Sequence, residues 1–145
     1  HDRAGGLGGC LYPRGGRTVS TFLSLHHVSV LVSDTGRALR FYRDLLGLQP
    51  DDSRPALDFP GAWLAVGEQQ IHLIEIPENM PTGPVVAHGG RDRHFALQVT
   101  ELEPVRARLE AHGVAFTLSR SGRRALFCHD PDGNAIELLE RPAPQ

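Results

Sequence analysis

Residues 130–142 read DPDGNAIELLERP, a polar turn that runs directly into an apolar strand carrying a glutamate. Pro131 and Gly133 are typical of a tight turn. The strand that follows places Glu137 between an isoleucine and a leucine. Burying a carboxylate alone costs several kcal/mol, so Glu137 either lies on a solvated strand face or receives a charge partner from the interior.

The same strand pattern occurs 65 residues earlier in the chain. Residues 71–77 read IHLIEIP and match residues 136–142, IELLERP, position for position. His72 therefore stands where Glu137 stands in the second copy. A period this long, present only twice, indicates a duplicated module rather than a solenoid.

The first strands and the helices repeat in the same way. His27 lies seven residues before Asp34, and His94 lies seven residues before Glu101. Each acidic residue stands where a helix is expected to begin. The two halves therefore keep one register from their first strand to their last.

Apolar periodicity and turn residues predict the elements of each half. The first half is expected to hold a strand at 25–32, a helix at 35–46 and strands at 62–66 and 70–76. The second half is expected to hold a strand at 93–99, a helix from a Thr100–Glu103 capping box to Gly113, and strands at 115–119, 125–128 and 134–140. This pattern predicts an α+β fold in which two βαβββ modules pair into curved mixed sheets around a central cleft.

The modules are expected at residues 21–78 and 92–142. A linker rich in proline and glycine is expected at 79–91, because that stretch has little periodicity. Residues 1–20 contain repeated glycines and read as a flexible leader, and 143–145 form a tail.

Composition limits the classes of partner. The chain has 145 residues, 40% of them apolar and 22% charged, with a formal charge of −2. These values are those of a soluble globular protein and predict neither nucleic acid nor membrane as a partner. Cys10 and Cys128 form no CxxC pair, which favours a reducing cytoplasm, and Cys128 is expected to be a small buried residue.

The repeat turns four scattered side chains into one set. His27 and His94 lie on the first strands, while His72 and Glu137 lie on the last strands, so all four are expected to line the central cleft. Three imidazoles and a carboxylate are ligands for one divalent transition metal, with Zn, Ni, Co, Mn and Fe all possible. His26 is the main competitor of His27, because a slip of one residue exchanges them. The remaining histidines are expected at the surface, in loops or at caps: His88, His112 and His129.

The chain resembles the vicinal oxygen chelate superfamily over about residues 25–141. This superfamily includes glyoxalases, methylmalonyl-CoA epimerases, fosfomycin-resistance thiol transferases, extradiol dioxygenases and metal-free bleomycin-binding proteins. The resemblance rests on His27 before an apolar strand, residues 41–42 (FY) followed by 45–48 (LLGL), His94 opening the second half, and DPDGN leading into Glu137.

The resemblance implies a metal-dependent enzyme whose small-molecule substrate binds the metal through two adjacent oxygens. Glyoxalases and epimerases use four ligand positions, here His27, His72, His94 and Glu137, so His72 favours a lyase or isomerase of the glyoxalase type. Glyoxalases commonly place a carboxylate at the position of His72, which leaves Glu137 as the only carboxylate base here. Thiol transferases and extradiol dioxygenases usually use three of the positions and are the alternatives, together with a binding protein that sequesters a small molecule. A homodimer is expected by analogy.

Aromatic and arginine side chains are candidates for binding the substrate. Three aromatic residues either pack in the core or form an apolar wall of the substrate site: Trp63, Phe95 and Phe127. Five arginines either bind an anionic tail of the substrate or lie on a solvated loop surface: Arg91, Arg93, Arg120, Arg123 and Arg124. Of these, Arg93 and Arg124 are predicted to contact substrate.

Overall fold

The computed structural model describes residues 21–76 and 86–142. The expected leader and tail, and most of the expected linker, lie outside these residues. Within them, no helix is long and apolar enough to cross a membrane.

The first module forms one four-stranded mixed sheet with a helical segment. Its elements are β1 (His27–Val32), α1 (Thr35–Leu39), the π-helical turn η1 (Arg40–Leu45), β2 (Gln49–Pro50), β3 (Gly61–Val66) and β4 (Gln69–Glu75). The strand order is β1-β4-β3-β2, in which β1 pairs with β4 in parallel and the other pairs are antiparallel.

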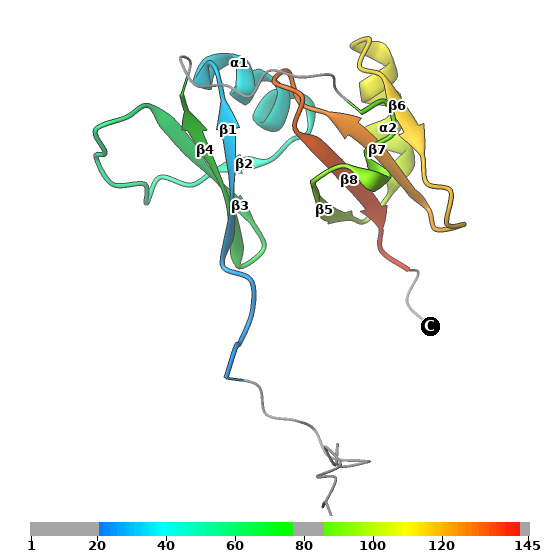
Figure 1. The fold of residues 1–145 in the computed structure, drawn as a ribbon, viewed down its shortest axis with the longest axis horizontal. Coiled ribbons are helices and arrows are strands. Elements are labelled where there is room, and N and C mark those ends of the chain that lie inside the picture. Colours follow the sequence, from blue (N-terminus) through cyan, green and yellow to red (C-terminus); the bar gives the residue numbers. More distant parts are fainter. Residues whose placement is uncertain (1–20, 77–85, 143–145) are drawn as a thin grey trace, which may run out of the picture.

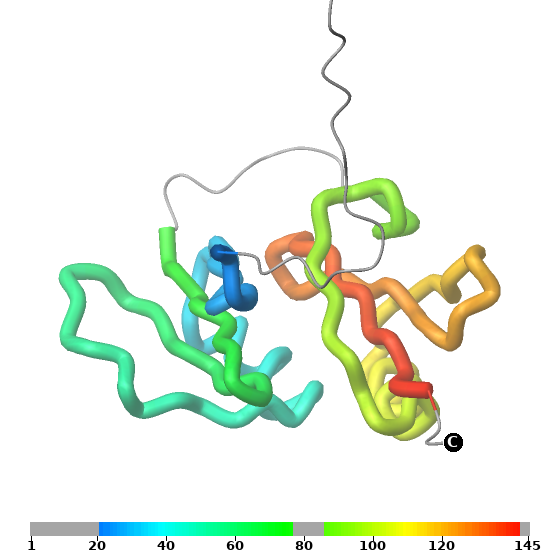
Figure 2. The backbone as a smooth tube through the Cα atoms, turned by 90° about the horizontal axis from the view of Figure 1, so that it is seen from below, coloured from blue at the N-terminus to red at the C-terminus, as the bar shows by residue number. Residues whose placement is uncertain are grey.

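The second module repeats this arrangement. A short turn η3 (Gly89–Arg91) precedes β5 (His94–Val99), α2 (Leu102–Ala111), β6 (Phe116–Leu118), β7 (Ala125–His129) and β8 (Ala135–Glu140). The order β5-β8-β7-β6, with β5 and β8 parallel, matches the first sheet strand for strand. The two modules lie side by side (Figures 1 and 2). The predicted α+β fold of two βαβββ modules is confirmed.

The last strand of each module helps to cap its helix. Asp34 accepts a hydrogen bond from Arg37 N at 2.7 Å, as a predicted N-cap residue should. The Glu75 carboxylate at the end of β4 accepts one from Thr35 N at 2.7 Å. Glu140, at the matching place in β8, accepts one from Leu102 N at 2.9 Å. The repeat therefore extends to the tertiary contacts that cap the two helices.

The predicted capping box of α2 is wrong. The N-cap residue is Glu101, which makes no side-chain capping bond. Glu103 instead pairs with Arg106 one turn later, at 2.6 Å. Glu140 on β8 already accepts a hydrogen bond from the amide of Leu102 in the first turn of α2. The local sequence around α2 carries no signal for a contact that comes from another strand.

The two sheets share one hydrophobic core. In β1 the alternate residues Val30 and Val32 are buried, while His27 and Ser29 on the opposite face are exposed. The buried faces of both sheets join the helices in a single cluster, which includes Tyr42 of η1 and residues of α2 and β8. The faces that carry the four predicted metal ligands lie on the other side of each sheet.

The turn at residues 130–134 fastens the second module to the first. Asp130 is 5% exposed, and its carboxylate accepts hydrogen bonds from Tyr42 Oη at 2.7 Å and from Asn134 N at 2.8 Å. Asn134 Nδ2 donates to Leu31 O at 3.0 Å. Burial and the neighbouring Asp130 raise the pKa of Tyr42 well above its usual value. The sequence predicted only a tight turn here, so its role between modules is a finding of the structure.

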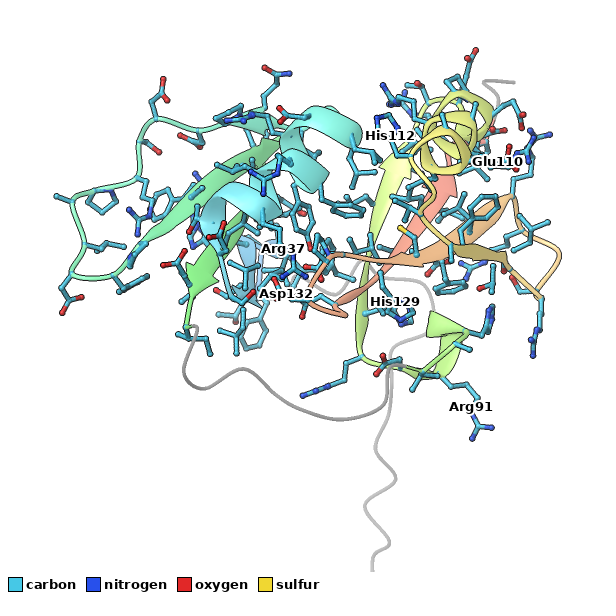
Figure 3. The ribbon with its side chains drawn as sticks, turned by 90° about the horizontal axis from the view of Figure 1, so that it is seen from above. Arg37, Arg91, Glu110, His112, His129 and Asp132 are labelled. Carbon is cyan, nitrogen blue, oxygen red and sulfur yellow. The ribbon has the colours of Figure 1, made fainter. Side chains whose placement is uncertain are left out.

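Two further contacts extend this junction. Ser33 Oγ donates to Asp132 Oδ1 at 2.6 Å, and the Arg37 guanidinium donates to the carbonyl of Pro131. Figure 3 shows the Arg37 and Asp132 side chains beside one another.

Cys128 provides a test of the core. Its side chain is fully buried on β7, and burial raises the pKa of the thiol to about 12. In a Cys10→Ser variant, we expect no reaction with a thiol-specific disulfide reagent at pH 8 in the folded state and one thiol per chain in guanidinium chloride. Rapid labelling of the folded variant would contradict this placement.

Candidate functional site

His27 and His72 meet on the open face of the first sheet. Because β1 and β4 are parallel neighbours, with Ser29 opposite His72, the two imidazoles fall on the same face. Their ring centroids lie 4.0 Å apart with 13° between the planes. Trp63, directly opposite His72 on β3, stacks on it at 4.1 Å and 4°. His72 is therefore held between His27 and Trp63.

A hydrogen-bond chain fixes the orientation of His72. Asp51 Oδ2 accepts from Gln70 Nε2 at 2.6 Å, so the amide oxygen of Gln70 faces His72 Nε2 at 2.9 Å. A carbonyl oxygen only accepts, so His72 Nε2 carries the hydrogen and Nδ1 keeps its lone pair. Burial, followed by the nearby His27 and His26, lowers the pKa of His72, which favours the neutral imidazole that metals bind.

His26 lies beside the pair without replacing His27. Its Nδ1 is 2.9 Å from Nδ1 of His27, and both side chains are exposed. The register that pairs His27 with Gln70 places His27, and not His26, on the face that carries His72.

His94 and Glu137 form the matching pair on the second sheet. Glu137 Oε2 lies 3.4 Å from His94 Nε2. His94 Nδ1 is 2.9 Å from the carbonyl oxygen of Asp92, which can only accept, so Nε2 is left with its lone pair. The Phe127 ring packs edge-on against His94 with centroids 5.3 Å apart.

The charge partner that Glu137 requires is Arg123. Glu137 is 5% exposed, and its Oε1 accepts a hydrogen bond from Arg123 Nη2 at 3.2 Å. The other oxygen, Oε2, faces the lone pair of His94 Nε2 at 3.4 Å, so Arg123 is the partner that compensates the charge. Arg123 was one of five arginines considered, and nothing in its spacing distinguished it, because the contact depends on the turn between β6 and β7.

The other predicted substrate residues lie in three different places. Trp63 and Phe127 stand beside the histidines on the open faces. Phe95 packs against the core cluster and, together with Arg93, lines a cavity of about 330 Å³ between β1 and β5. The Arg124 guanidinium pairs with Glu140 at 2.8 Å.

The four predicted metal ligands form two pairs in one chain. Among the described residues, no group of three or more His, Cys, Asp or Glu side chains lies close enough to hold one metal ion. Each pair nevertheless supplies donors of the right chemistry: imidazole nitrogens with free lone pairs at His72 and His94, and a carboxylate at Glu137. This donor set fits a divalent transition metal. The metal site itself stays a prediction.

Comparison with known proteins assigns this arrangement to a family. Residues 24–138 match the Glyoxalase/Bleomycin resistance protein/Dioxygenase superfamily. The chain belongs to this superfamily.

Relatives within the superfamily have different names. Over 120 residues the chain is 34% identical to "Glyoxylase I 4" of Arabidopsis thaliana, covering 79% of this chain and 69% of that protein. It is 31% identical over 118 residues to "Glutathione transferase FosA" of Serratia marcescens, covering 79% of each. A solved glyoxalase/dioxygenase from Nostoc punctiforme shares the fold with a TM-score of 0.69 at 22% identity, covering 87% of this chain and all of that one. Superfamily membership therefore leaves the reaction open.

Proposed function

We propose that the protein is a metal-dependent lyase or isomerase of the glyoxalase type. Its substrate would be a small 2-oxo compound, or the thiol adduct of one, chelated through two adjacent oxygens. His27, His72, His94 and Glu137 would hold one divalent metal ion. The observation that carries the proposal is the hydrogen-bond chain from Asp51 through Gln70 to His72, which leaves Nδ1 of His72 free for a fourth ligand bond.

We infer that the site is completed between two chains. The two pairs are separate in one chain, and each lies on a sheet face directed away from the shared core. A twofold axis that brings the first-module face of one chain against the second-module face of its copy would unite His27 and His72 with the partner's His94 and the partner's Glu137. The same operation builds two equal sites per dimer. This arrangement gives the expected homodimer a role in the site.

The chain's own residues account for the proton transfer. When bound, the metal would supply Lewis-acid polarisation of the substrate oxygens. Glu137 would take the proton from the carbon next to the polarised carbonyl and return it to the neighbouring carbon. The hydrogen bond from Arg123 to Oε1 keeps the carboxylate aimed. Trp63 and Phe127 offer apolar ring faces and edges that would exclude water from the substrate.

Thiol transfer is the second candidate, supported by the 31% identity to the Serratia protein named as a glutathione transferase. Extradiol ring cleavage with iron and metal-free drug binding are also consistent with membership of the superfamily. The proposed four-ligand site differs from all three in requiring His72. Metal content of a His72 variant therefore separates these functions.

The test is elemental analysis of the protein purified without added metal. We expect one divalent metal ion per chain, and in His72→Ala an affinity lower by at least about 10 to 100 times, the loss typical when even an outer-shell partner of a ligand is removed. His112→Ala is the matched control, because His112 is exposed at the end of α2 and its Nδ1 contacts only the Arg108 carbonyl. Iron retained equally by His72→Ala would favour ring cleavage, and metal-free protein that refuses added metal would favour the binding protein.

A further inference from the structure

Two histidines on the first sheet are stacked in a way that conflicts with binding one metal ion together. The ring planes of His27 and His72 differ by 13°, and their centroids lie 4.0 Å apart. An imidazole nitrogen binds a metal ion in the plane of its ring, at a distance of about 2 Å. Two nearly parallel planes at this separation share no point that is so close to both rings. One of the two rings must therefore turn before both can bind the same ion.

His72 is the ring that is held in place. Trp63 covers its other face at 4.1 Å with 4° between the planes, and Gln70 Oε1 lies 2.9 Å from its Nε2. Gln70 is fixed in turn by its hydrogen bond to Asp51 Oδ2. Asp51 Oδ1 accepts hydrogen bonds from Ser53 N at 2.9 Å and from Ser53 Oγ at 2.6 Å, so this carboxylate has a set orientation. Rotation of His72 would break the stack on Trp63 and the hydrogen bond to Gln70 together.

His27 is the ring that can turn. It is exposed, whereas His72 is half-buried. Within the described part of the chain, its ring makes one hydrogen bond, between its Nδ1 and Nδ1 of His26 at 2.9 Å. These two rings meet edge to face, with centroids 5.1 Å apart and 84° between the planes. Exposed side chains change rotamer within nanoseconds, so the stack and the contact with His26 decide where this ring rests.

We propose that His27 is a turning ligand and that His26 is the positioning residue that holds it on the stack. The inference rests on the proposed function, in which His27 and His72 bind one ion. His72 would offer its Nδ1 in a fixed direction, and His27 would leave the stack and its hydrogen bond with His26 in order to bind beside it. The His26 contact therefore opposes metal binding. Removing it should have the opposite effect to removing a ligand.

The experiment titrates chelator-treated protein with Co²⁺ at pH 8, so that protons do not compete for the imidazoles. Trp63 is the only tryptophan of the chain, and an ion bound at His72 should quench its fluorescence. We expect His26→Leu, which has no hydrogen-bonding atom, to bind Co²⁺ about 2 to 10 times more tightly than wild type, as for the removal of one competing hydrogen bond. His26→Asn is the matched control, because its amide keeps a polar atom near the place of Nδ1 and should preserve the wild-type affinity.

A second measurement reads the ring orientations directly. In a crystal structure of the protein with bound Zn²⁺, we expect the angle between the planes of His27 and His72 to open well beyond 13°. The stack of His72 on Trp63 should keep its nearly parallel geometry. His27 would then be the ring that has moved.

Each outcome has a defined meaning. Weaker Co²⁺ binding in His26→Leu would make His26 itself a ligand, and unchanged binding would leave it no part in holding His27, so either result overturns the proposal. Bound metal with both rings still stacked would also overturn it, while the proposed function keeps its own test at His72. A protein that takes up no metal would refute the proposed function and, with it, the turning of His27.

Discussion

A mixture of His27→Ala and Glu137→Gln chains is expected to recover about one quarter of wild-type turnover, although each variant alone is inactive. In a dimer with two shared sites, the mixed dimer has one site with both substitutions and one with neither. Equal mixing makes half of the dimers mixed, and each of these has one intact site of two. The assay is isomerisation of the hemithioacetal of a 2-oxoaldehyde after mixing, unfolding and refolding.

The separate variants set the scale of this experiment. Removing the carboxylate base at Glu137 should lower turnover by about 10² to 10⁴, and His27→Ala should act through lost metal. His112→Ala mixed with Glu137→Gln is the control, because it should yield a quarter of wild-type turnover from intact His112→Ala dimers plus a quarter from mixed dimers. A His27→Ala and Glu137→Gln mixture as inactive as its parents would place each complete site within one chain.

Asp130→Ala is expected to lower the free energy of unfolding by about 3 kcal/mol, since a buried acceptor with several donors is lost. The change would leave Tyr42 Oη and the amides of residues 132 and 134 without their acceptor. Urea unfolding followed by circular dichroism measures the loss. Asp44→Ala is the control, because Asp44 is an exposed residue paired only with its neighbour Arg43, and it should change stability by less than about 0.5 kcal/mol.

The pH dependence of stability gives this junction a second signature. The folded-state pKa of Tyr42 is raised above its unfolded value near 10. The stabilisation is therefore complete below pH 10 and is lost as the pH rises from there through the raised folded-state pKa, because in that range the unfolded chain releases the phenolic proton more readily than the folded chain. Tyr42→Phe should remove this part of the alkaline decline. Equal declines in wild type and Tyr42→Phe would contradict the raised pKa.

The sequence determined the duplicated fold because local periodicity and repeat spacing are properties of the chain itself. The match of residues 71–77 with 136–142 predicted two equivalent last strands, and the structure confirms strands there with identical pairing. The same match placed His72 and Glu137 at equivalent positions. The apolar residues around Glu137 left two alternatives for its carboxylate, a solvated strand face or a charge partner in the interior.

Only the tertiary structure decided which groups meet across long sequence separations. Arg123 became the partner of Glu137 through a turn whose direction the sequence pattern does not fix. Glu140, on the distant strand β8, caps α2 in place of the expected capping box. The separation of His27 and His72 from His94 and Glu137 depends on how the helical sides of two sheets pack into one core. Strand periodicity specifies the face on which a side chain lies, but the direction in which that face points depends on contacts between modules.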